Sequence, residues 1–392
     1  MLQRKILMVN LPFAGHTNPT LELARILVGL GHQVAYIHAP EWCEKVEQTG
    51  AQFIPYDNYT DGLSASRKEL RSFSAAYDTV FRVGKDFDCL IYEMLFVSGK
   101  ALADRLGIPS FRLFSTFALN EQVILDFAQT GGWQLTAFFR YKTLLKLLSR
   151  RLQKRFGWYY PDIIKEITRN SPALNFVYTV KEFQPYANDF DEETYQFVGA
   201  SIGDRGEVAF DFSKMSETII YISLGTLLNT SIKFFKTCIE AFGNQPVSVI
   251  MSIGKTIKQE QLGKLPDNVF AYPYVPQLEI LQKASLFITH GGMNSVNESI
   301  YYGCPMLVIP MGNDQPRVAQ QVKDLHLGKT LAHKGLTAKQ LRDSAYSVLQ
   351  DSSYKKKLEE FQNLSHLAGG NQAIARMILK ILEHEPKENR HR

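Results

Sequence analysis

The sequence is short of cysteine, has no long apolar run and carries only a small excess of charge. Its four cysteines, Cys43, Cys89, Cys238 and Cys304, form neither a CxxC pair nor a Cys/His cluster. This spacing argues against a zinc site and is typical of a reducing compartment. No run approaches the roughly 20 apolar residues that a membrane-spanning helix needs. The first apolar run, Lys5–Pro12, follows no charged-then-apolar leader, so we expect a cytoplasmic protein.

The net charge of +5 is unevenly spread along the 392 residues. Seven basic residues and no acidic one lie in 140–155, which leaves the rest of the chain slightly acidic. A nucleic-acid-binding protein shows a basic face built from several elements, so we expect no nucleic-acid partner. Three interpretations of segment 140–156 stay open: a covering helix with a solvated basic face, a site for an acidic acceptor, and a weak contact with an anionic membrane surface.

Short apolar runs alternate with helical patterns in both halves of the chain, which predicts an α/β fold. The predicted strands are Lys5–Pro12, Gln33–His38, Cys89–Tyr92 and Phe111–Phe114, then Ile219–Leu224, Val247–Ser252, Leu286–Thr289 and Met306–Ile309. Their near-continuous apolar character is typical of parallel strands covered on both faces. The chain is also too long for one ordinary hydrophobic core.

We therefore expect two Rossmann-like domains. The predicted boundaries are 1–200 for an N-terminal, acceptor-binding domain, 201–216 for a linker, 217–370 for a C-terminal, nucleotide-sugar-binding domain, and 371–392 for a C-terminal helix that packs back towards the N-terminal domain. The linker prediction rests on an acidic, aromatic and glycine-containing stretch in which the strand–helix rhythm weakens.

The segment 286–315 (LFITHGGMNSVNESIYYGCPMLVIPMGNDQ) predicts a diphosphate site. A buried strand runs into His290, two glycines follow, and a helix opens near Asn294. Glycines allow a close approach of the backbone, and the first amides of a helix can bind an anion at the carboxyl end of a parallel sheet. The side chains available for a nucleotide sugar are His290, Asn294 and Ser295 for the diphosphate, Glu298 for the ribose, and Asp314 and Gln315 for the hexose.

A histidine lies between the first predicted strand and helix, in the stretch NLPFAGHTNP at 10–19. His16 is expected at the carboxyl edge of the first sheet. Its ordinary pKa of about 6.5 leaves it neutral near pH 7 and able to accept a proton from a hydroxyl group. An isolated histidine at this place is also compatible with a capping or structural role.

Together these segments resemble the family-1 inverting UDP-glycosyltransferases of the GT-B fold, and in particular the Bacillus-type macrolide glycosyltransferases. The family motif His-Gly-Gly-x-Asn-Ser is matched by His290, Gly291, Gly292, Asn294 and Ser295, its ribose-binding glutamate by Glu298, and its acidic-Gln pair by Asp314 and Gln315. The stretch that frames the uracil base is matched by Tyr274, Val275 and Gln277, with tyrosine in place of the usual tryptophan. The turn beside the diphosphate is matched by Ser223, Gly225 and Thr226.

The resemblance also assigns a catalytic pair. Gly15 and His16 match the family element that carries the catalytic base, and the family pairs this histidine with an acidic residue, usually aspartate. The matching position is Glu93, whose side chain is one methylene longer. A carboxylate there fixes the imidazole tautomer and stabilises the imidazolium ion.

The resemblance implies a GT-B fold, with two Rossmann-like, doubly wound parallel-sheet domains facing across a cleft. It implies a UDP-dependent hexosyltransferase that inverts configuration, with a UDP-sugar as co-substrate and without a cofactor or an obligatory metal. The expected acceptor is a small lipophilic macrolide (an antibiotic, for instance), polyketide or phenol. Apolar side chains of the first half that are candidates for its pocket are Phe13, Phe114, Phe117, Phe127 and Trp133.

Three alternatives stay open at this point. One is a membrane-peripheral lipid glycosyltransferase that uses the basic segment 140–156. Another is a nucleotide-sugar epimerase with two similar domains, against which the elements at His16 and at Asp314–Gln315 argue. The last is a nucleotide-sugar-binding homologue whose catalysis is weakened because Glu93 replaces the usual aspartate.

Overall fold

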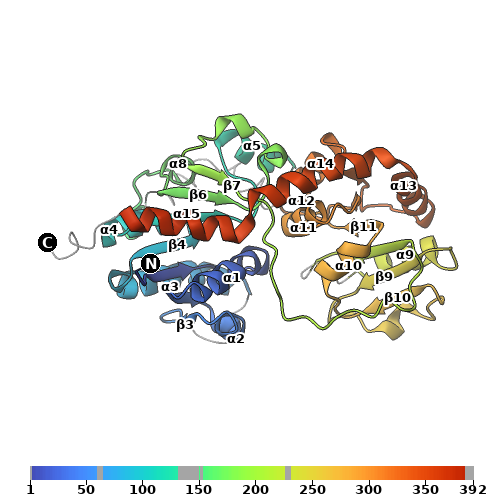
Figure 1. Cartoon of the computed structure of the whole chain (residues 1–392), viewed down its shortest axis with the longest axis horizontal. Helices are drawn as coiled ribbons and strands as arrows, with labels where there is room; N and C mark the ends of the chain where they lie inside the picture. The colour runs from blue at the N-terminus through green and yellow to red at the C-terminus, as the bar shows by residue number, and fades with distance from the viewer. Residues whose placement is uncertain (1, 60–64, 131–149, 151–152, 226–230, 385–392) are drawn as a thin grey trace. The chain divides into compact units, whose positions relative to one another are not determined.

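The structure, a computed structural model, describes residues 2–59, 65–130, 150, 153–225 and 231–384. The chain divides into two compact units, each with its own parallel sheet (Figure 1). Unit 1 comprises Met1–Leu125, Ala137–Gly203 and Ala368–Arg392, and unit 2 comprises Asp126–Thr136 and Asp204–Leu367. One of the points at which the chain passes between the units, Gly203–Asp204, lies within the segment 201–216 that the sequence predicts as a linker.

Within the described residues, the sheet of unit 1 has seven strands in the order β3-β2-β1-β4-β5-β6-β7, all paired in parallel. They are β1 (Lys5–Val9), β2 (Gln33–His38), β3 (Gln52–Pro55), β4 (Cys89–Glu93), β5 (Ser110–Phe114), β6 (Leu174–Val177) and β7 (Tyr195–Phe197). The strand order reverses between β1 and β4, and in open α/β sheets ligands bind outside the carboxyl ends of the strands at such a reversal.

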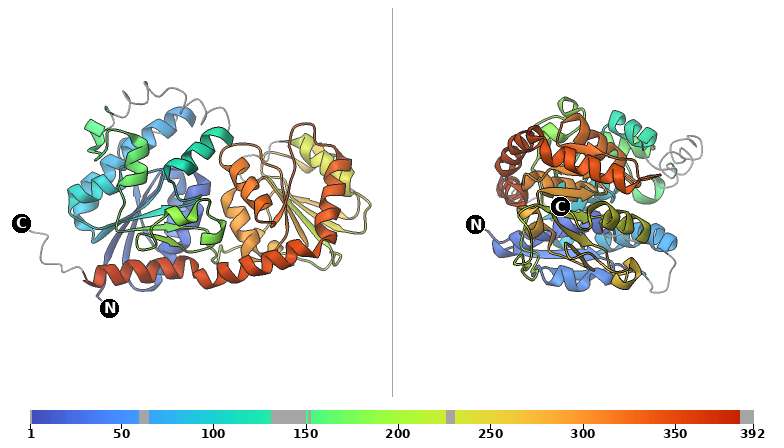
Figure 2. Two further views of the ribbon diagram at one scale, coloured as in Figure 1. Left: turned by 90° about the horizontal axis from the view of Figure 1, so that it is seen from above. Right: turned by 90° about the vertical axis from the view of Figure 1, so that its right-hand side faces the viewer.

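Helices cover both faces of this sheet. They are α1 (Ala14–Gly29), α2 (Cys43–Glu47), α3 (Ala65–Val83), α4 (Gly99–Leu106), α8 (Ile163–Arg169) and α15 (Gly370–His384), together with the start of α5 (Glu121–Thr130). The C-terminal helix α15, red in Figure 2, lies along unit 1 and packs against α1. It buries Ile374, Ile378 and Leu382 in the core of this unit, where the Arg4 guanidinium donates to the Leu382 carbonyl.

The described part of unit 2 contains a six-stranded parallel sheet in the order β10-β9-β8-β11-β12-β13. Its strands are β8 (Ile219–Ser223), β9 (Ser248–Ser252), β10 (Val269–Tyr272), β11 (Leu286–Thr289), β12 (Met306–Val308) and β13 (Gly328–Thr330). Its helices are α9 (Ile232–Phe242), α10 (Gln277–Lys283), α11 (Met293–Tyr301), α12 (Gln315–Asp324), α13 (Ala338–Gln350) and α14 (Ser352–Ala368). Here the order reverses between β8 and β11.

The predicted α/β class is confirmed: each half forms a doubly wound parallel sheet, and all eight predicted strands are present. The burial agrees with the sequence pattern, since Ile6, Leu7 and Val9 of β1 and Ile220 and Ile222 of β8 have no exposed surface. Among the described residues, no helix is both long and apolar enough to span a bilayer.

Candidate active site

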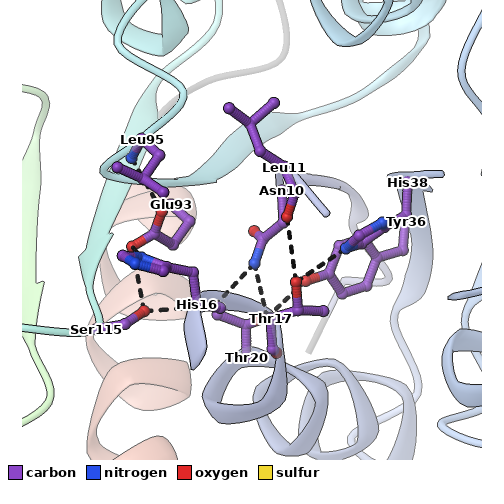
Figure 3. A network of polar contacts seen from close by, with 10 residues as sticks. All are labelled: Asn10, Leu11, His16, Thr17, Thr20, Tyr36, His38, Glu93, Leu95 and Ser115. Atoms are coloured by element: carbon purple, nitrogen blue, oxygen red, sulfur yellow. Dashed lines mark hydrogen bonds and ion pairs between the residues drawn. The ribbon is translucent and has the colours of Figure 1, made fainter. Parts of the chain in front are cut away.

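In unit 1 a histidine and a glutamate meet at the carboxyl edge of the sheet (Figure 3). His16 lies in the first turn of α1, directly after β1, and Glu93 is the last residue of the neighbouring strand β4. Nδ1 of His16 lies 2.6 Å from Oε1 of Glu93. An ionised carboxylate only accepts hydrogen bonds, so Nδ1 carries the proton and Nε2 is the nitrogen that can accept one. The Glu93 side chain is 1% exposed and the His16 side chain 26%, so the base remains accessible.

The Glu93 carboxylate is held at both oxygens. Oε1 also accepts a hydrogen bond from Ser115 Oγ at 3.1 Å, and Oε2 accepts one from the Leu95 backbone N–H at 2.9 Å. A buried charge needs such donors, because burial removes it from water. The extra methylene of glutamate is therefore accommodated, and the structure brings the two predicted residues together. Their catalytic role remains a prediction.

Ser115 and Asn10 belong to this arrangement, although the sequence did not single them out. Ser115 follows β5, the strand beside β4, and its hydroxyl also lies 3.3 Å from the His16 carbonyl. The Asn10 side-chain amide donates to the same carbonyl at 3.0 Å and to Thr20 Oγ1 at 3.2 Å. Ser115 directly follows the predicted strand Phe111–Phe114. This position at the end of a buried strand was the sequence signal that could have identified it.

Buried polar side chains connect α1 to β2 beside the turn that carries His16 (Figure 3). Nδ1 of His38 accepts the Ala39 N–H at 2.8 Å, so Nε2 carries the proton and donates to Thr17 Oγ1 at 2.9 Å. Burial lowers the pKa of His38 to about 3, which keeps the ring neutral. Thr20 donates to the Thr17 carbonyl at 2.7 Å, so the Tyr36 hydroxyl donates to Thr20 at 2.5 Å. These bonds fix the first two turns of α1.

The predicted acceptor side chains differ in burial and in the unit to which they belong. Phe13 is half-buried and stands edge-on to the His16 ring at 6.2 Å. Phe114 and Phe117 have no exposed surface: as the end of a covered strand and the turn after it, they are core residues. Their contact with an acceptor stays a prediction. Phe127 is half-buried in α5 and is grouped with unit 2. Trp133, like most of segment 140–156, lies outside the described residues.

In unit 2 a glycine-rich turn joins β11 to α11. Gly291 has φ +83°, a left-handed conformation that side chains disfavour. The His290 ring packs between two glycines, because a Cβ on Gly225 would lie 2.6 Å from its Cε1 and one on Gly292 2.5 Å from its Nε2. Burial lowers the pKa of His290 to about 4, so this ring is a neutral hydrogen-bonding group near pH 7. The first amides of α11 face out of the same turn and suit an anion.

Glu298, in the second turn of α11, is the centre of a polar cluster. Gln277 Nε2 donates to its Oε2 at 2.5 Å and contacts Ser295 Oγ at 3.3 Å, and the Tyr221 hydroxyl donates to Gln277 Oε1 at 3.1 Å. Oε1 of Glu298 forms an ion pair with Arg205, a residue that the sequence did not single out. Partial burial lowers the pKa of Arg205, but the Glu298 carboxylate more than offsets this and raises it above its ordinary value.

The predicted base-binding residues flank this cluster. The Tyr274 side chain is largely exposed, as a stacking surface has to be, and its hydroxyl donates to the Glu207 carboxylate. Partial desolvation of the hydroxyl, then the hydrogen bond to Glu207 and the charge of that carboxylate, raise the pKa of Tyr274, so the phenol stays protonated. Val275 is buried in the core, which leaves its backbone as the part that can meet a base.

The other predicted donor residues lie after the strands next to this turn. Gln315 is buried, and its Oε1 accepts the backbone N–H groups of Met311 at 2.9 Å and Gly312 at 3.1 Å, so its amide nitrogen is the part that can serve a ligand. Asp314 is half-buried immediately before α12. Ser223 ends β8, and Gly225 N–H lies 3.4 Å from its hydroxyl. Thr226 lies outside the described residues, and Asn294 is half-buried in the first turn of α11.

No group of three or more His, Cys, Asp and Glu side chains among the described residues is arranged to hold a metal ion. That the reaction needs no obligatory metal stays a prediction, which rests on the family resemblance.

Comparison with known proteins gives the family context of the chain. Residues 196–368 match the family model described as UDP-glucoronosyl and UDP-glucosyl transferase. The chain is 32% identical to the uncharacterized UDP-glucosyltransferase YojK of Bacillus subtilis, over 96% of this chain and 97% of that protein. It is 28% identical to the oleandomycin glycosyltransferase of Streptomyces antibioticus, over 98% of this chain and 92% of that protein. The crystal structure of the kitacinnamycin glycosyltransferase is similar, with a TM-score of 0.83 and 27% sequence identity. The match covers 97% of this chain and 99% of that one.

Proposed function

Since this chain belongs to the UDP-glucoronosyl and UDP-glucosyl transferase family and is a glycosyltransferase of the GT-B fold, we propose that it transfers glucose from UDP-glucose to a hydroxyl group of a small lipophilic natural product. The observation that carries this proposal is the contact of His16 Nδ1 with the buried Glu93 carboxylate, which leaves Nε2 as an accessible base.

In the proposed reaction His16 Nε2 takes the proton of the acceptor hydroxyl while the oxygen attacks the anomeric carbon of the sugar. The bond between that carbon and the β-phosphate oxygen breaks, and UDP leaves with the bonding electrons. Attack from the face opposite the nucleotide inverts the configuration and gives a β-glucoside from an α-linked donor. The imidazolium ion formed at His16 is stabilised by Glu93, which stays ionised.

We propose that unit 2 holds the donor. The amides of the first turn of α11 and the neutral His290 ring meet the charge that develops on the departing diphosphate, so no obligatory metal ion is invoked. Glu298 takes the ribose hydroxyls, the exposed Tyr274 ring takes the uracil, and Asp314 with the Gln315 amide nitrogen takes the hexose hydroxyls.

A natural-product acceptor is supported by the relatives named oleandomycin glycosyltransferase and demethyllactenocin mycarosyltransferase. In this chain, Phe13 is an aromatic ring that stands against the proposed base, and we propose that it contacts the acceptor. The alternative of a membrane lipid as acceptor depends on the basic segment 140–156, most of which lies outside the described residues.

Mass-spectrometric product detection tests this function. The purified chain is incubated with UDP-glucose and a panel of macrolides, polyketides and phenols, beside His16→Ala and the matched control His384→Ala, an exposed histidine at the end of α15. A mass gain of one hexose is expected with the wild type and the control and not with His16→Ala. No mass gain with any acceptor, in a preparation that binds UDP, contradicts the proposal.

A further inference from the structure

We propose that Arg205 is a positioning residue of the nucleoside site: it holds the Glu298 carboxylate so that the enzyme discriminates ribose from 2′-deoxyribose. This inference rests on the proposed function, in which Glu298 accepts the ribose hydroxyls. Arg205 lies at the start of the Asp204–Leu367 part of unit 2, 93 positions before Glu298, and the two side chains form an ion pair within that unit.

The two oxygens of Glu298 are held by different protein donors. Gln277 donates to Oε2 at 2.5 Å, and the Arg205 guanidinium donates to Oε1. The Glu298 side chain is only 6% exposed, whereas that of Arg205 is 36% exposed. A carboxylate with so little access to water is stabilised by a nearby positive charge, and an N–H group on each oxygen keeps it in one orientation. Arg205 supplies that charge and the second of these donors.

With these two donors in place, the oxygens of Glu298 can still accept hydrogen bonds from a ligand. Each carboxylate oxygen can accept two hydrogen bonds, so Oε1 and Oε2 can each take one more beyond the bonds from Arg205 and Gln277. The vicinal 2′- and 3′-hydroxyl groups of a ribose offer two donors to such a pair of oxygens. A 2′-deoxyribose offers only one hydroxyl donor, so one oxygen of the desolvated carboxylate lacks its ligand hydrogen bond. A site that binds a hydroxyl group through hydrogen bonds discriminates strongly against a ligand that lacks this hydroxyl.

The segment that carries Arg205 contacts a second nucleoside residue. Two residues further on, Glu207 accepts a hydrogen bond from the hydroxyl of Tyr274, the ring proposed to stack on the base. Between them Gly206 has φ +63°, and its N–H donates to Asp204 Oδ1 at 2.8 Å, which closes a tight turn. The turn is thus fixed at both ends on residues that are proposed to bind the ribose and the base.

Calorimetric titration with UDP and with 2′-deoxy-UDP tests the inference, since both measurements need no acceptor. The variants are Arg205→Ala, Arg205→Lys, Glu298→Ala and the control Lys339→Ala, which breaks the exposed ion pair with Asp343 in the same unit. Arg205→Ala is expected to weaken UDP binding about tenfold or more and to bring the ratio of the two affinities close to one. Arg205→Lys is expected to recover part of both effects, and Lys339→Ala to change neither.

The other outcomes are distinguishable. Tighter UDP binding by Arg205→Ala overturns the inference, because it means that the guanidinium competes with the ribose for Glu298. Unchanged UDP binding and an unchanged affinity ratio in Arg205→Ala, together with a loss in Glu298→Ala, also overturn it but leave the proposed function intact. Unchanged UDP binding in Glu298→Ala contradicts the proposed donor site itself. If Arg205→Ala unfolds, the affinity ratio measured with Arg205→Lys decides.

Discussion

The hydroxyl of Ser115 lies 3.1 Å from Oε1 of Glu93, the same carboxylate oxygen that contacts Nδ1 of His16. The serine therefore belongs to the support of the proposed base, although it does not reach Nδ1 itself. Because Glu93 is buried, the orientation of its carboxylate depends on these few donors rather than on water.

Removing this hydroxyl is expected to slow transfer without weakening the donor site. Ser115→Ala takes away one hydrogen bond to a buried carboxylate, worth about 1–2 kcal/mol, so kcat falls about 5- to 30-fold while the KM for the UDP-sugar stays near the wild-type value. Ser98→Ala is a matched control, since Ser98 is also buried in unit 1 but contacts Trp158. A fall in kcat of the same size in both variants would mean a general loss of stability.

The charge of Glu93 is expected to matter more than its shape. Glu93→Gln keeps the length of the side chain but no longer stabilises a positive imidazole, so kcat is expected to fall about 100-fold or more. Glu93→Asp keeps the charge but withdraws the carboxylate from its 2.6 Å contact with His16, and a smaller loss is expected. Steady-state kinetics at saturating UDP-sugar measures both. A Glu93→Gln variant as fast as the wild type contradicts a base that depends on this pair.

Strand prediction succeeded for near-continuous apolar runs and missed other strands, among them the fully buried β6 (LNFV), whose asparagine interrupts the apolar run. All residues of β1 after Lys5 and all of β8 are buried, and their apolar runs identify them. The short edge strands β3 (QFIP) and β13 (GKT) carry polar or partly exposed residues, and no apolar run reveals them. Their place in the sheets depends on the neighbouring strands β2 and β12, which is information that local sequence does not contain.

The site residues also divide into those that the sequence predicts and those that only the structure reveals. Residues of the turn after β11 are close in sequence, so their pattern predicted a shared site. Ser115 and Arg205 meet their partners over 22 and 93 positions, and only the folded chain brings them together. The burial of Phe114 and Phe117 could not be predicted for a different reason: an aromatic residue at the end of a strand has the same sequence signature whether it lines a pocket or fills the core.

A methyl group on Gly292 is expected to displace His290. The backbone of Gly292 has φ −62°, which alanine adopts readily, so Gly292→Ala tests the 2.5 Å approach of His290 Nε2 rather than backbone strain. We expect UDP affinity to fall about tenfold or more and stability to fall by about 1–3 kcal/mol. Gly29→Ala is the control, since its Cβ would meet no atom within 4 Å. Calorimetric titration and thermal unfolding measure the two effects, and unchanged UDP binding contradicts the role given to His290.

The buried ring of His38 is expected to make unit 1 sensitive to acid. Its folded pKa of about 3 lies below the ordinary value of 6.5, so the unfolded chain binds the extra proton between these values. Above pH 6.5 the ring is neutral in both states and does not lower the free energy of unfolding. Below pH 6.5 the free energy of unfolding falls by up to about 1.4 kcal/mol per pH unit. The Trp42 ring lies 4.9 Å from His38, and tryptophan fluorescence during urea unfolding at pH 7.5 and 5.5 follows this region. His38→Gln is expected to lose less stability over that interval, and an equal loss contradicts the assignment.

The central claim is that His16 is the base of an inverting transfer. Proton NMR of the product formed from UDP-α-glucose, followed over time for the wild type and for His16→Ala, tests it most directly. A β-linked anomeric proton that grows with the wild type, and that does not grow with a His16→Ala variant still able to bind UDP, is the predicted result. An α-linked product, or an undiminished rate in His16→Ala, would contradict it.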